Sequence, residues 1–305
     1  MGTIRLVLYL FLAIALSAPL SGQAVQLPTD IGTSARMIGI GNIEGFDPSA
    51  AGVFENPAGH MGRSGFSVSG FATRIMDEVN YANIAFKLVS PIGVVGFGMA
   101  DTSTGGLPAT FRNTSSEIES RGDFGFRTIL SKLTYQVPIW ERLVAGVGLN
   151  YFYSESLNIY ARGWNADFGM ALDLNAFQIS SVVKNPLTLQ KIRYSNGGSA
   201  TFPFQWTVAG KYSTGVFETY GQFKWLRLSE NPLLAAGLKV YPVFPNKIFS
   251  FSAGIRELTA GDRKIMVAPL GLGLELGQLD FHFAYSRNDY VGDPNNYYVS
   301  LTSNF

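Results

Sequence analysis

The feature that most constrains this chain is a two-residue alternation of apolar and polar side chains, which recurs in long segments. In LDFHFAYS, residues 279–286, the apolar face carries Leu279, Phe281, Phe283 and Tyr285. The stretches 142–153, 164–174 and 265–276 alternate in the same way. A period of two residues is typical of a β-strand that has one apolar and one polar face. The chain is therefore predicted to be all-β.

Two architectures share this pattern, because a soluble sandwich hides its apolar faces whereas a membrane barrel turns them outward to lipid. The segments approach the 9–11 residues of a tilted transmembrane strand, which are longer than ordinary strands. Their polar faces also carry many charges, and a dry core would not accept them unpaired. The lumen-facing candidates are Lys211, Glu218, Lys224, Lys239, Arg256, Glu275, Asp280 and His282, with Lys87, Lys132 and Asp167 on earlier segments. We therefore predict a transmembrane antiparallel β-barrel.

The alternating segments predict about fourteen strands and a regular difference between their connections. The strands are expected at 65–73, 80–89, 92–100, 126–137, 142–153, 164–174, 176–184, 203–212, 216–227, 233–241, 247–256, 265–276, 278–287 and 296–305. Connections after odd strands are expected to be long loops, notably 101–125, 154–163, 185–202 and 288–295. Those after even strands are short. Bacterial barrels combine an even strand number with short periplasmic turns and longer external loops.

Both ends of the chain support export to an outer membrane. Residues 1–24 predict a signal peptide, with Arg5 before the apolar run 6–16 and small residues at Gly22 and Ala24. The chain closes on NNYYVSLTSNF, which predicts a final strand that pairs with the first and leaves no edge in lipid. Tyr297, Val299, Leu301 and Phe305 alternate there, similar to the C-terminal signal by which barrel-assembly machinery recognises outer-membrane barrels.

Residues 25–64 lack the strand pattern and are rich in Gly and Ala. This stretch resembles the N-terminal region of FadL-type fatty acid transporters and of the related PorV/PorQ proteins. The resemblance rests on Ser34-Ala35-Arg36, Gly39, Gly41, Asp47-Pro48-Ser49-Ala50 and the block Asn56, Pro57, Ala58, Gly59. It extends to 182–192, 202–213 and the last hairpin, although Lys184 stands where Gln is usual and Phe202 where Leu is usual.

The resemblance implies a fourteen-stranded barrel, here 65–305, whose segment 25–64 folds into the lumen as a hatch or plug. It leaves three functions open. One is passive uptake of hydrophobic, long-chain fatty acid-like molecules. The second is a PorV/PorQ-like accessory role in protein secretion or surface attachment, with a partner protein bound by the loops. The third is a structural or general-diffusion barrel.

Composition argues against other classes of function. The formal net charge of +1 gives no reason to expect a nucleic-acid partner. With no cysteine and only two histidines, His60 and His282, we expect no metal centre and no cofactor. A lipid hydrolase would need a Ser-His-acid arrangement near the membrane edge. His282 is expected within a strand and facing the lumen, so we do not expect an enzyme.

Overall fold

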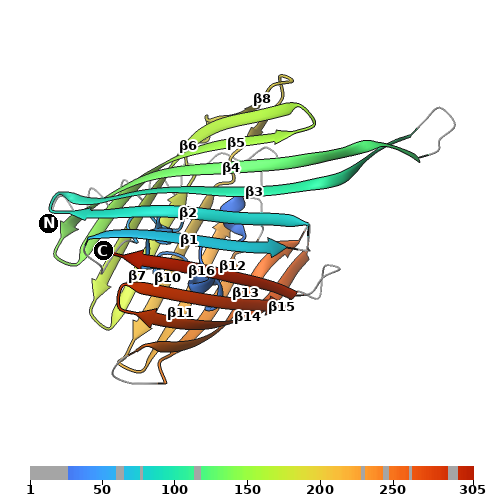
Figure 1. The fold of residues 1–305 in the computed structure, drawn as a ribbon. Helices are drawn as coiled ribbons and strands as arrows, with labels where there is room; N and C mark the ends of the chain where they lie inside the picture. Colours follow the sequence, from blue (N-terminus) through green and yellow to red (C-terminus); the bar gives the residue numbers. More distant parts are fainter. Residues whose placement is uncertain are drawn as a thin grey trace.

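The computed structural model describes residues 27–59, 65–75, 78–112, 118–227, 231–242, 247–260, 263–287 and 295–305. The signal peptide predicted for residues 1–24 lies outside these ranges. Sixteen strands are present in the described residues, and fourteen of them form the wall of a closed barrel (Figure 1). The wall strands are β1 (Phe66–Ile75), β2 (Val79–Ser90), β3 (Gly93–Arg112), β4 (Ile118–Trp140), β5 (Leu143–Ser156), β6 (Ile159–Leu174), β7 (Phe177–Lys184), β10 (Gln205–Ser213), β11 (Phe217–Leu226), β12 (Leu233–Val240), β13 (Phe249–Ala260), β14 (Arg263–Leu276), β15 (Leu279–Arg287) and β16 (Asn295–Asn304).

The barrel closes where the last strand meets the first. β16 pairs antiparallel with β1 from Ser67↔Asn304 to Arg74↔Tyr297. Beyond Asn304, the Phe66 and Phe305 backbones exchange hydrogen bonds of 3.2 and 2.8 Å, and their rings stack at 6.1 Å. Phe305 therefore extends the pairing between the last strand and the first. The predicted all-β antiparallel barrel of about fourteen strands is confirmed.

The two faces of the wall differ as the alternation predicts. Outward-facing side chains such as Leu270, Leu272, Val299 and Leu301 are exposed. Inward-facing side chains alternate with them and are buried even when polar, as at Asp280, His282 and Ser300. The outer surface is thus an apolar band suited to lipid, whereas the interior is a packed polar network. No described helix is long or apolar enough to cross a bilayer.

The predicted loops differ from the observed structure in three places. Residues 101–125 were expected to form a loop, but β3 and β4 continue through most of them as a ribbon that projects well beyond the barrel (Figure 1). The expected loop 154–163 is a tight turn at Leu157–Asn158, where both residues have positive φ angles of 47° and 63°. Residues 185–202 contain a small hairpin of β8 (Lys191–Tyr194) and β9 (Ser199–Thr201). In this hairpin β8 pairs with β6, and neither strand is one of the fourteen that form the wall. Gly105, Gly106 and Pro108 are residue types typical of loops. In the ribbon they lie at two register shifts between β3 and β4, where irregular pairing accommodates them.

Residues 27–59 fill the interior with three short helical turns: η1 (Pro28–Asp30), α2 (Ala35–Ile38) and η2 (Ala50–Phe54). The helix α2 contacts β14, β15 and β16, and η2 contacts β1, β2, β3 and β4. Figure 1 shows this segment, in blue, behind the front wall of the barrel. We call the described residues 27–59 the plug. The two ends of the barrel are called the turn end, where the short connections and the C-terminus lie, and the loop end.

The outward face of β14 gives a test of membrane depth. Leu272 and Leu276 are 51% and 53% exposed, but Leu272 lies near the middle of the strand and Leu276 at its turn end. We expect Leu272→Arg to destabilise the folded barrel by about 2–4 kcal/mol and Leu276→Arg by about 0–1 kcal/mol. Reversible folding into lipid vesicles measures both. Equal costs at the two depths would contradict a lipid-facing β14.

Candidate functional site

The plug backbone lies directly against the wall at a row of glycines on three neighbouring strands. Gly237 of β12, Gly254 of β13 and Gly271 of β14 face the plug segment 39–41. A Cβ at Gly237 would overlap the Ile40 carbonyl oxygen, and one at Gly254 would overlap the Gly41 nitrogen. Gly41 itself has φ +94°, a conformation that favours glycine. We call Gly237, Gly254 and Gly271 the first glycine seat.

A second glycine seat, formed by Gly146 of β5 and Gly169 of β6, holds the C-terminal end of the plug. Gly146 and Gly169 are register partners, and a Cβ at either would overlap Pro57 or Asn56. Asn56 is fully buried, and its amide nitrogen donates to Ser180 Oγ at 2.8 Å and to the Ser181 carbonyl at 3.2 Å. Its amide oxygen accepts from the Ala58 nitrogen at 2.8 Å. The Asn-Pro-Ala-Gly block therefore fastens the plug to the wall.

Charged side chains fasten the plug between the two seats. Glu44 of the plug contacts Lys184 of β7 at 2.6 Å and Lys224 of β11 at 2.5 Å. Its backbone nitrogen also donates to Gln222 Oε1 at 2.7 Å. Burial by itself would raise the pKa of Glu44, but the two lysines lower it to about 2. Glu44 is thus ionised at neutral pH, and it links two strands through one carboxylate.

A second charged group anchors α2. Arg36 lies 3.6 Å from Glu275 of β14, and Glu275 in turn pairs with Lys239 of β12 at 3.0 Å. Burial opposes the charge of Arg36, but Glu275 and Asp47 raise its pKa. Asp47 is also buried, which disfavours its ionised form. Arg36 and hydrogen bonds from Ser34 and Ser49 nevertheless lower the Asp47 pKa.

The opposite wall holds the plug through hydrogen bonds to its carbonyl oxygens. Lys87 of β2 donates to the Pro48 carbonyl at 2.5 Å, and Asn83 donates to the Thr33 carbonyl at 3.0 Å. Lys132 of β4 donates to the Phe54 carbonyl at 3.4 Å and pairs with Asp167 of β6 at 2.5 Å. Plug and wall are therefore joined around the circumference of the barrel.

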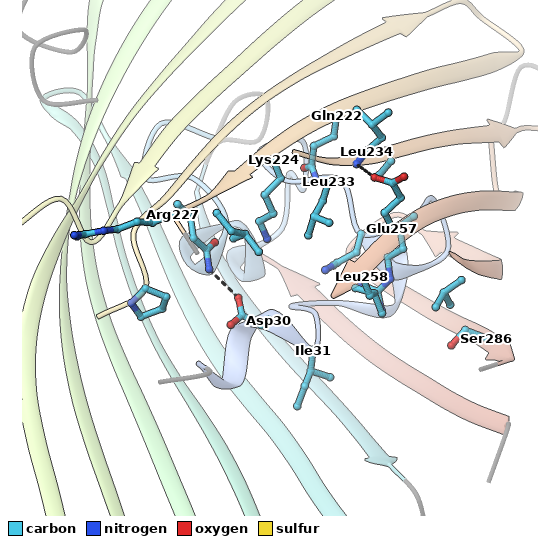
Figure 2. A pocket seen from close by; sticks show the side chains of 18 of the residues that line it. Asp30, Ile31, Gln222, Lys224, Arg227, Leu233, Leu234, Glu257, Leu258 and Ser286 are labelled. Carbon is cyan, nitrogen blue, oxygen red and sulfur yellow. Dashed lines mark hydrogen bonds between the residues drawn. The ribbon is translucent and has the colours of Figure 1, made fainter. Parts of the chain in front are cut away.

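Above the plug, toward the loop end, lies a cavity of about 450 Å³. Asp30, Ile31, Gly41 and Asn42 of the plug form its floor. Its walls carry the apolar residues Ile75, Phe202, Phe204, Leu226, Leu233, Leu258 and Val267 together with the polar residues Gln205, Gln222, Lys224, Arg227, Arg256, Ser286 and Asn296. Figure 2 shows Asp30 and Ile31 facing Gln222, Lys224 and Leu233 across this space. The volume is in the range of small-molecule pockets.

The residues singled out in the sequence occupy different parts of this arrangement. Asp47 and the block Asn56, Pro57, Ala58, Gly59 lie in the plug, and all five residues are buried within it or against the wall. All eight lumen-facing candidates lie on the inner side. Glu275 and Lys224 pair with plug residues there, and Lys239 pairs with Glu275. Lys211 and Glu218 instead pair with each other at 3.1 Å. Asp280 and His282 are buried toward the turn end of β15, away from the cavity.

Arg36, Glu44 and Glu55 were not predicted from the sequence as site residues. Arg36 and Glu44 pair with charged wall residues, and Glu55 accepts hydrogen bonds from Thr33 and Gly45 within the plug. Their signal was weak, because a charge in a Gly-rich segment normally indicates a solvated loop. The buried acids Glu44, Asp47 and Glu55, each of which needs a partner, become informative only once the barrel encloses them. Among the described residues, no group of His, Asp and Glu side chains could hold a metal ion.

The burial of Glu55 within the barrel predicts that docking of the plug depends on pH. Burial, reinforced by Asp47 and Glu44, raises the pKa of Glu55 to about 8, despite hydrogen bonds from Thr33 Oγ1 at 2.6 Å and the Gly45 nitrogen at 2.8 Å. Because this value lies above the ordinary 4.5, ionisation of Glu55 disfavours the docked state. The contribution of Glu55 to docking is complete below about pH 4.5 and is lost as the pH rises through 8.

We therefore expect channel openings in a planar bilayer to become more frequent between pH 5 and pH 8.5. Glu55→Gln keeps a neutral head group of similar shape, so its openings should show little change over the same range. A wild-type opening frequency that is flat with pH, or a Glu55→Gln response as steep as that of the wild type, would contradict this assignment.

Comparison with known proteins supports the architecture. The chain resembles the structure of the Pseudomonas putida toluene transporter TodX, with a TM-score of 0.61 and 9% identity, over 90% of this chain and 98% of that one. A TodX mutant described as a monoaromatic hydrocarbon channel gives a TM-score of 0.63 and 11% identity, over 90% and 99%. No protein-family profile matches the chain, and no curated protein matches it by sequence. The barrel expected from the FadL-type resemblance is confirmed as a fold, whereas the PorV/PorQ resemblance stays a prediction.

Proposed function

We propose that this protein is an outer-membrane channel for passive uptake of hydrophobic small molecules, and that the plug is its gate. In this proposal residues 1–24 are a cleaved signal peptide, 25–64 are the hatch and 65–305 are the barrel. The C-terminal strand, with Tyr297, Val299, Leu301 and Phe305 outward, engages the assembly machinery. The loop end then faces the exterior and the turn end the periplasm.

The observation that carries the proposal is the position of the cavity relative to the plug. Apolar and polar side chains both line the cavity, and its floor is the plug segment at Gly41 and Asn42. A molecule that enters from the loop end is therefore stopped by residues that sit on the first glycine seat. Movement of this segment off the seat would extend the cavity toward the turn end. The shared fold with TodX, whose structure is that of a toluene transporter, supports the same substrate class.

A disulfide across the first glycine seat tests the gate. A Cβ at Gly39 would lie 2.6 Å from Ser252 Oγ, so cysteines at the two positions are within disulfide reach. The chain has no native cysteine, so the engineered pair is unique. In the Gly39→Cys/Ser252→Cys variant, uptake of toluene or a long-chain fatty acid into proteoliposomes should fall at least about tenfold on oxidation and recover on reduction.

The single variants Gly39→Cys and Ser252→Cys serve as controls and should not respond to the oxidant. If the oxidised pair takes up both compounds as fast as its reduced form, gating by the plug is wrong. The alternative of a secretion accessory then gains weight.

One observation favours that second candidate. β3 pairs with β2 only as far as Ser103, and β4 pairs with β5 only from Phe126 onward. The ribbon formed by 104–112 and 118–125 therefore leaves the barrel with both outer edges unpaired among the described strands. An isolated two-stranded ribbon is marginally stable in water, so a partner protein at this ribbon would stabilise it.

A further inference from the structure

The lipid-facing side of the wall carries a groove directly behind the first glycine seat. The groove has a volume of about 460 Å³ and lies across the four neighbouring strands β12, β13, β14 and β15. Two adjacent rows of register partners line it on the outer face. One row is Val240, Phe251, Leu272 and Phe283, and the other is Leu238, Ala253, Leu270 and Tyr285.

The groove exists because Ala253 is a small side chain among large ones. Its register partners on the two flanking strands are Leu238 and Leu270. Its outward neighbours along β13 are Phe251 and Ile255. All four of these large side chains are exposed on the outer face of the barrel. A methyl group between four large side chains leaves a hollow in the apolar surface.

The floor of the groove is the backbone of the wall itself. Ser252 and Gly271 also line the groove, although both face inward to the plug. A Cβ at Gly271 would lie 3.0 Å from Ser252-side packing at Gly271's own plug neighbour, the Gly39 region, because Gly271 belongs to the first glycine seat. A molecule in the groove is therefore separated from the plug only by the wall backbone.

The depth of the groove in the membrane indicates what occupies it. Leu272 lies near the middle of β14, and the hydrocarbon core of a bilayer offers acyl chains and no bulk water at that depth. The polar lining groups are turned elsewhere, since Tyr285 donates its hydroxyl to Asn295 Oδ1 at 2.7 Å and Ser252 Oγ lies on the plug side. The occupant therefore needs to be apolar.

A lipid chain fits this surface better than a second copy of the protein does. Two apolar protein surfaces gain no hydrophobic driving force from meeting in lipid, because lipid tails are equally apolar. A stable contact between copies would need polar groups or a close approach of small residues, whereas large side chains surround Ala253. A flexible acyl chain in the groove gains dispersion contacts on several sides.

We propose that this groove binds one acyl chain of a membrane lipid, which packs against the wall behind the first glycine seat. The lipid is a resident ligand of the outer wall and is distinct from any molecule that passes through the lumen. The proposal therefore does not depend on uptake through the cavity.

Photolabelling in a bilayer tests the site. The full barrel is placed in phosphatidylethanolamine vesicles, in which a small fraction of the lipid carries a diazirine in the middle of one acyl chain. After illumination, labelled peptides are identified by mass spectrometry. Labelling of residues 251–253 and 270–272 should exceed that of residues 297–301 at least about threefold. The reference peptide contains Val299, the register partner of Phe283 and thus at the same depth.

Two matched variants separate the groove from the general lipid surface. Ala253→Phe fills the groove and should reduce its labelling to the level of residues 297–301. Ala236→Phe, at an exposed alanine of β12 that does not line the groove, should leave the labelling unchanged. Folding of both variants is checked by the gel shift between unheated and boiled samples.

Equal labelling of the groove and the reference peptide in the wild type would overturn the proposal, and so would groove labelling that Ala253→Phe does not change. A dimer in native mass spectrometry that Ala253→Phe disrupts would assign the groove to a second copy of the chain and would also overturn the lipid site.

Discussion

The contact on which this structure depends is the one between the plug backbone and wall positions that carry no side chain. At Gly237, Gly254, Gly146 and Gly169, a single methyl group would overlap the plug. Two seats of this kind let a segment without long secondary structure lie against the barrel at van der Waals distance. Such a contact excludes water, and every polar group beneath it then has to find a partner within the protein.

The buried charges follow from that exclusion of water. Glu44 neutralises two lysines, Arg36 and Lys239 share Glu275, and wall residues such as Lys87 are hydrogen-bonded to plug carbonyls. A lumen filled with water would not need these pairings. The plug is thus held by close packing against the glycine backbone at the seats and by specific charges between them. Breaking one charge would leave its partners buried without compensation, which favours a plug that moves as a unit.

Much of the fold could be predicted from the sequence, because lipid outside and polar groups inside impose a strict alternation. Each of the fourteen expected strands overlaps an observed wall strand. The ends of the strands were less predictable. Leu157 gives no sign that it adopts a positive φ angle, and Gly105, Gly106 and Pro108 read as a loop although they lie in a ribbon. In the site, the Asn56 block was visible as a motif. The pairing of Glu44 with Lys184 and Lys224 depends on closure of the barrel, which brings together residues far apart in the sequence.

Closure of the lumen by a plug that rests on a wall without side chains is measured directly by the single-channel conductance of two glycine variants. Gly254→Val places a side chain under the plug, whereas Gly221→Val, on the neighbouring part of the wall, has no atom within 4 Å of its new Cβ. The account predicts large, long-lived openings for Gly254→Val and wild-type behaviour for Gly221→Val. Wild-type closure in both variants would show that the plug does not close the barrel by resting on the glycine seats.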